Sequence, residues 1–222
     1  MMPMGRLLDS APVARGRRRA VGLGALVLVV AWLAGCASGG RLVQDSVQTH
    51  LLWVPAAPRV APASAGPVLL VSPPGVRAGL DSPRIAYVQR PFELSYFARS
   101  EWADTPARML QPLLVQSLEG SGAFQAVVAG PSPAVADLRL ETEVLALQQE
   151  FLSTPSVARV ALRAQVVDPA SRRVVATDTF EAVEPADSAD PYGGVVATNR
   201  ALGRVLAELT AFVSRLGRGA AR

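Results

Sequence analysis

The fold is decided by residues 137–183, DLRLETEVLALQQEFLSTPSVARVALRAQVVDPASRRVVATDTFEAV, which contain three segments of alternating apolar and polar side chains. In the first segment, 137–151, the alternation changes phase at Val144-Leu145, which predicts a β-bulge. The second segment, 157–167, is followed by a turn sequence at 168–171 and by a returning segment, 173–183. Because each segment has one apolar and one polar face, the pattern predicts an antiparallel sheet covered on one side only.

Two amphipathic helices are available to cover the apolar face. The first is expected to begin at Thr105-Pro106, because Thr is a good N-cap and Pro suits the first helical position, and to end at residues 120–122. The second is expected to begin at Asp190-Pro191, to repeat apolar residues at helical spacing, and to end at Gly217. The predicted fold class is therefore α+β, a mainly antiparallel sheet with two amphipathic helices covering one face.

Shorter strands are expected outside this region, around the first helix. A stretch with four Pro and five Ala, residues 55–67, is expected to be an extended loop rather than a helix or a central strand. The segments with strand-like composition are 47–54, 68–71, 84–89, 92–97 and 124–128.

Composition excludes several classes of site. The 222 residues contain one Cys and one His, so neither an internal disulfide nor a zinc site built on several Cys or His ligands is possible. All 22 basic residues are Arg, which excludes chemistry that depends on Lys. The formal net charge of +4 arises entirely within residues 1–35, so bulk charge does not support a nucleic-acid partner for the rest of the chain.

The first 35 residues have the composition of a secretory signal. A basic segment, 15–19, precedes an uncharged run, 20–35, which is short for a membrane-spanning helix. The run ends in Leu33-Ala34-Gly35-Cys36, which resembles a bacterial lipobox, and this resemblance implies cleavage before Cys36 and acylation at that residue, including palmitate. The alternative is an uncleaved single-span anchor with an inert Cys36.

The domain organisation expected from these signals has four parts. They are a lipoprotein signal peptide at 1–35, a lipidated flexible tether at 36–46, a single α+β domain at 47–217 and a tail at 218–222. Lipoproteins kept in the inner membrane resemble Cys-Asp at the cleavage point, whereas this chain has Cys36-Ala37. That difference implies a lipid-anchored protein at the periplasmic face of the outer membrane rather than of the inner membrane.

The order of motifs along the chain resembles the ABC-type transport auxiliary lipoprotein family, the PqiC-like lipoproteins of MCE systems. The residues that carry the resemblance, in order, are Cys36, 50–52, 68–74, 80–85, Glu93-Leu94, 101–104 and 199–202. Two positions depart from the family pattern, since His50-Leu51 replaces an aromatic pair and Gly79 replaces an aromatic residue. The fold that the resemblance implies is similar to the TolB amino-terminal domain.

The resemblance implies a non-enzymatic subunit of a transport system that moves lipid between the inner and outer membranes. Its implied partners are an MCE-domain protein, an ABC permease and an ATPase, with the membrane contacted through the lipid anchor and with no cofactor. Two alternatives remain open: an outer-membrane assembly or structural lipoprotein without a role in lipid transport, and a periplasmic hydrolase that uses carboxylates.

Aromatic residues are concentrated within 87–102 and are the candidate partner-binding residues, since aromatics are enriched at the cores of interfaces. They are Tyr87, Phe92, Tyr96, Phe97 and Trp102. The alternative for each is packing inside the protein, above all for Trp102 beside the start of a helix.

Three arginines are expected to face outward: Arg139, Arg159 and Arg163. They either meet lipid phosphates or an acidic partner, or pair with Glu141 and Glu143 on a solvated sheet face. His50, the single His, has no second His to join it in a metal site.

Overall fold

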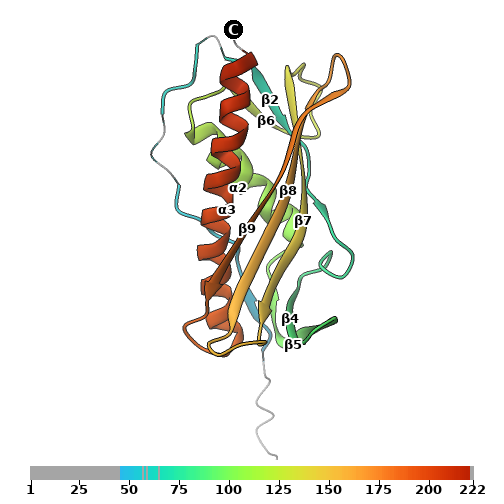
Figure 1. The fold of residues 1–222 in the computed structure, drawn as a ribbon, viewed down its shortest axis with the longest axis vertical. Helices are drawn as coiled ribbons and strands as arrows, with labels where there is room; N and C mark the ends of the chain where they lie inside the picture. The colour runs from blue at the N-terminus through green and yellow to red at the C-terminus, as the bar shows by residue number, and fades with distance from the viewer. Residues whose placement is uncertain (1–45, 57, 59, 65, 221–222) are drawn as a thin grey trace, which may run out of the picture. The chain divides into compact units, whose positions relative to one another are not determined.

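The computed structural model describes residues 46–56, 58, 60–64 and 66–220. These residues form an α+β body with 40% strand and 26% helix, which confirms the predicted fold class. In the described residues, helices α2 (Pro106–Gly120) and α3 (Pro191–Ala220) pack against one face of a nine-stranded sheet (Figure 1). No helix in the described ranges combines the length and the apolarity needed to cross a membrane.

Three long strands form the antiparallel part of the sheet. They are β7 (Leu138–Glu150), β8 (Val157–Asp168) and β9 (Arg173–Pro185), paired in that order. The β7–β8 register shifts between Val144 and Ala146, which confirms the predicted bulge. The extra residue in β7 is Leu145, and it moves the buried positions of the alternation from even to odd numbers. Leu147, which is paired with Val160, therefore still lies on the helix-covered side of the sheet.

Shorter strands join the sheet mainly in parallel, and the sequence does not predict these pairings. Strand β7 is central: it pairs on one edge with β8 and on the other with β2, β3 and β4. Strand β6 pairs with β2, strand β1 pairs with β5, and the antiparallel hairpin β4–β5 completes the sheet. The bounds of these strands are β1 (Gln48–His50), β2 (Val68–Val71), β3 (Gly75–Val76), β4 (Arg84–Arg90), β5 (Glu93–Trp102) and β6 (Ala126–Ala129).

The expected strand over 47–54 is wrong beyond His50. After β1 the chain lies along α3, where the Trp53 backbone N–H donates to Asn199 Oδ1 at 3.0 Å and Asn199 Nδ2 donates to the Leu51 carbonyl at 3.2 Å. One helix side chain therefore satisfies the backbone groups that a neighbouring strand would otherwise have paired. Conversely, β5 extends past the predicted 92–97, because β1 adds a partner for Ser100 to Trp102.

Helix α2 begins and ends as predicted, with Thr105 at the N-cap and Ser121 at the C-cap. Helix α3 begins as predicted but does not end at Gly217, since it continues to Ala220. A Cβ built on Gly217 would lie 2.6 Å from Cε1 of the buried Phe124. Gly217 is therefore a point of close helix–ring packing, and the expected helix stop there is wrong.

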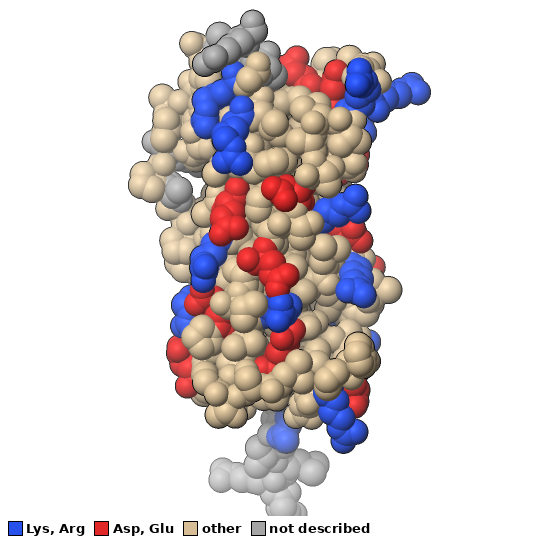
Figure 2. All heavy atoms as spheres, in the orientation of Figure 1, with Lys and Arg blue, Asp and Glu red and all other residues tan. Residues whose placement is uncertain are grey.

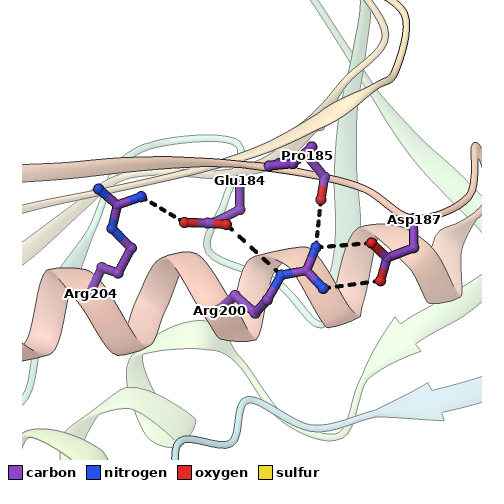
Figure 3. Close-up of polar contacts among 5 residues, drawn as sticks. All are labelled: Glu184, Pro185, Asp187, Arg200 and Arg204. Atoms are coloured by element: carbon purple, nitrogen blue, oxygen red, sulfur yellow. Dashed lines mark hydrogen bonds and ion pairs between the residues drawn. The ribbon is translucent and has the colours of Figure 1, made fainter.

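An ion-pair network fastens α3 to strand β9 (Figure 3). The Arg200 guanidinium donates to Asp187 at 3.0 Å and to the Pro185 carbonyl at 2.6 Å. Glu184 accepts from Arg204 at 2.7 Å and lies 3.9 Å from Arg200 Nε. The network supplements the apolar contacts between the helix and the sheet.

Candidate functional site

The predicted aromatic residues do not form a single surface. Trp102 is only 2% exposed and belongs to the core, the alternative that the sequence left open. Tyr96 is half-buried, with its hydroxyl donating to the Gly79 carbonyl at 2.7 Å and its ring 3.8 Å from the Arg84 guanidinium carbon. These contacts hold the base of the β4–β5 hairpin together.

Tyr87 and Phe97 face each other across the hairpin, with ring centroids 4.6 Å apart. Phe151, at the end of β7, completes this cluster at 5.9 Å from Tyr87 and 6.4 Å from Phe97. All three residues are half-buried. The cluster therefore joins the hairpin to the central strand and leaves part of each ring on the surface.

Phe92 differs from the other four, because it stands at the tip of the hairpin and is fully exposed. Its backbone φ of 69° lies in the left-handed region that Gly or Asn usually occupies. A large aromatic residue at such a position contributes nothing to the core. Its presence therefore calls for an explanation outside the folding of the chain.

A hollow of about 410 Å³ lies beside this tip, between the hairpin and the end of β7. Two more exposed apolar side chains border it, Leu94 from β5 and Leu152 from the β7–β8 turn. We refer to Phe92, Leu94 and Leu152 together as the apolar tip. Leu152 and Phe151 are absent from the sequence prediction, although an apolar pair directly before the turn residues Ser153 and Thr154 is a usable signal.

Charged side chains surround the apolar tip: one weak ion pair, one carboxylate held by an arginine, and an exposed arginine. Arg90 and Glu93 lie 3.8 Å apart and are both largely exposed, so their interaction is weak. Glu150, which also lines the hollow, is paired with Arg159 at 2.8 Å, and the hydrogen bond from Arg159 to Glu150 raises the pKa of that guanidinium. Arg77 lines the same hollow and is exposed.

The other predicted candidates lie on the polar sheet face or near α3. Arg139 forms an ion pair with Glu141 at 3.0 Å, without hydrogen-bond geometry at its Nε, and Arg159 pairs with Glu150 and Glu181. Arg163 lines a shallow hollow beside Glu141 and Glu143. These placements favour a solvated face with mixed charges.

His50 is half-buried, with its ring centroid 6.5 Å from that of Tyr192, and burial lowers its pKa. Within the part of the chain that the structure describes, no group of three or more His, Cys, Asp or Glu is placed to hold a metal ion.

Two further hollows, of about 430 and 580 Å³, lie beside α2. A single carboxylate, Glu119, lines both of them, so neither contains an acid–base pair of the kind that carboxylate hydrolases use. Blue and red side chains are intermixed over the face drawn in Figure 2, and neither sign dominates it.

Comparisons with known proteins give the family. The model of the ABC-type transport auxiliary lipoprotein component family matches residues 50–210. A crystal structure of a Xanthomonas campestris protein of family DUF330 is 27% identical, with a TM-score of 0.70, covering 78% of this chain and 98% of that one.

A second crystal structure, of an uncharacterized protein, is 14% identical with a TM-score of 0.57, covers 77% of this chain and 98% of that one, and shows the fold alone. The search of curated proteins finds no match. On the evidence of the family match, the chain belongs to the ABC-type transport auxiliary lipoprotein family.

Proposed function

We propose that the protein is a non-enzymatic subunit of an MCE-type ABC transport system that moves lipid between the inner and outer membranes. It is anchored through acylated Cys36 at the periplasmic face of the outer membrane and docks an MCE-domain protein, which works with a permease and an ATPase. The observation that carries the proposal is the family match over residues 50–210, which names a transport auxiliary lipoprotein.

The described body supports docking rather than catalysis. Its buried interior is filled mainly by a large apolar cluster between the sheet and the two helices, with a small second cluster of three alanines. The most buried carboxylate contacts, at Glu150 and Glu184, are made to arginines and fix strands and α3 in place. These charged groups therefore have a structural role, and the half-exposed aromatic cluster of Tyr87, Phe97 and Phe151 is where we propose that the protein partner docks.

Crosslinking in the native cell envelope, followed by purification of the full lipidated chain, tests this proposal. We expect an MCE-domain protein among the crosslinked products, identified by mass spectrometry. The matched control is residues 1–46 fused to an unrelated domain, which has the same anchor but lacks the docking body.

Recovery of no MCE-domain protein, or equal recovery with the control, would overturn the transport role and favour a structural lipoprotein. Hydrolysis of envelope lipids or glycans by the purified chain would contradict the non-catalytic part of the proposal.

A further inference from the structure

Three of the exposed apolar side chains lie together at one end of the described body. The register between β4 and β7 pairs Val88 with Glu150, so the hairpin tip and the β7–β8 turn lie side by side. Figure 1 shows β4 and β5 at the same end as the turn that joins β7 to β8. Phe92, Leu94 and Leu152 are all exposed there, and Phe92 protrudes completely.

The chain enters the body from the direction of this end. Strand β1 runs parallel to β5, with Gln48 beside Ser100, and continuing this register by two residues places Ser46 about level with Ala98. Strand β5 begins at Glu93, next to Phe92, so the hairpin tip lies about 20 Å further on, at ~3.3 Å per strand residue.

The segment from Cys36 to Ser46 is long enough to cover that distance. Its ten residues reach at most about 35 Å when fully extended. An acyl anchor at Cys36 and the tip of the hairpin can therefore meet the same membrane surface without any unfolding of β1.

The charges beside the tip suit a membrane surface. Arg90 and Arg77 are exposed there, while the carboxylate of Glu150 is held by Arg159. Guanidinium groups next to exposed apolar side chains fit the boundary between lipid phosphates and acyl chains. Glu93, the remaining acid at the tip, is exposed and close to Arg90, which offsets its charge.

The size of the tip also favours lipid over protein. A stable protein interface buries about 800 Å² on each partner, whereas one aromatic side chain buries only about 150–250 Å². The three side chains of the apolar tip, two from the hairpin and one from the β7–β8 turn, would need a large surrounding contact surface to hold a protein partner. They do suffice as the second, weak signal that supplements a lipid anchor.

We propose that the apolar tip of Phe92, Leu94 and Leu152 inserts into the interfacial layer of the bilayer that holds the anchor. The inference rests on the proposed function for the anchor at Cys36, and it assigns Phe92 to lipid rather than to the protein partner. Contact at two points, the anchor and the tip, sets the orientation of the body relative to the membrane and leaves the far end of β7 facing away from it.

Site-specific fluorescence on the full lipidated chain tests this inference. Because acylation occupies Cys36, an introduced Cys is the one free thiol, and Phe92→Cys is labelled with an environment-sensitive nitrobenzoxadiazole dye. The matched control is Val135→Cys, since Val135 is 92% exposed and precedes the opposite end of β7. Both proteins are reconstituted into vesicles of phosphatidylethanolamine and phosphatidylglycerol, with and without nitroxide-bearing phospholipid.

We expect the label at position 92 to shift to shorter emission wavelength on reconstitution and to be quenched severalfold more by the nitroxide lipid than the label at 135. Equal, weak quenching at both positions would overturn the inference. A blue shift at 92 without lipid quenching would also overturn it, because a second copy or another protein would then cover the tip.

Flotation of the vesicles shows whether the chain is anchored, since an unacylated chain would not float with them. Weak quenching at position 92 in protein that floats therefore counts against the tip and not against the anchor. The variant Phe92→Ser is expected to retain its thermal melting temperature and its crosslinking to the MCE-domain protein. Loss of that crosslink at unchanged stability would show that the tip docks protein instead of lipid.

Discussion

Gly203 and Gly217 occupy the same helix, but their surroundings give them different roles. A Cβ built on Gly203 would lie 3.6 Å from Val54 Cγ1, an ordinary contact, whereas one on Gly217 would lie 2.6 Å from the ring of Phe124. Phe124 is buried, so its ring has little room to move aside. Gly203 therefore lowers the helix propensity of α3 although a Cβ would fit there, whereas Gly217 permits close packing against Phe124.

We expect Gly217→Ala to lower the free energy of unfolding by about 1–3 kcal/mol through overpacking. Gly203→Ala should raise it by about 0.5–1 kcal/mol, because Ala has the higher helix propensity. Urea unfolding of the two variants and the wild type measures both effects. Equal stabilisation by the two substitutions would contradict the close packing at Phe124.

Two kinds of contact hold helix α3 against the sheet: the packing of its apolar face and its ion pairs to the end of β9. A buried charge disrupts the first kind, and acidic pH weakens the second. Leu202, Val205 and Leu209 are completely buried against the sheet, as their helical spacing predicts. Arg200 and Arg204 lie on the border of that face and reach Glu184 and Asp187.

A charge on the apolar face should unfold the body. Leu209→Asp would bury a carboxylate without a partner, and we expect loss of the cooperative thermal transition. The control is Ala207→Asp, which places the same residue type on the exposed face of α3. Circular dichroism melting distinguishes them, and native-like melting of Leu209→Asp would contradict the packing of this helix.

The ion pairs should make stability depend on pH below about 4. The hydrogen bond from Arg200 lowers the pKa of Asp187 below its usual 3.8, so this carboxylate stabilises the fold above pH 3.8 and loses the effect as pH falls through the lower folded-state pKa. We expect the difference in melting temperature between the wild type and Arg200→Gln to narrow in that range. The bond from Arg200 to the Pro185 carbonyl does not titrate, so part of the difference remains.

A difference that stays constant from neutral pH to below the pKa of Asp187 would show that this carboxylate contributes nothing to stability. Thermal melts of both proteins across this pH range make the comparison.

For the whole molecule, the net positive charge lies before Cys36, and the chain from Cys36 onward is neutral on balance. The excess of positive charge lies in residues 1–35, and the remaining residues carry no net charge, so electrostatic attraction alone does not hold the body at a membrane. Under the proposed function, stable attachment comes from acyl chains at Cys36, and the proposed insertion of the apolar tip supplements it.

We expect Cys36→Ser to abolish acylation and stable membrane attachment while leaving the melting temperature of the body unchanged. Fractionation after a carbonate wash, with mass spectrometry of the amino-terminal peptide, measures the effect. Retention of the variant in the washed membrane fraction would contradict anchoring at this residue.

Local patterns determined much of the fold. Alternation predicted the strands of residues 137–183 and the bulge after Val144, since a period of two sets which side chains face the helices. Helical spacing likewise predicted the buried face of α3. Signals of this kind reside in neighbouring residues and need no knowledge of distant contacts.

Tertiary structure decided what depends on partners far along the chain. The end of β1 was set by Asn199, the continuation of α3 through Gly217 by Phe124, and the parallel pairing of β2, β3 and β4 by central β7. The same applies to the site. The sequence shows that aromatic residues are concentrated within 87–102, but only the packing of the fold placed Trp102 in the core and left Phe92 exposed beside Leu152. Burial is a property of the neighbours that the fold supplies, and for this reason a local pattern could not separate these two aromatic residues.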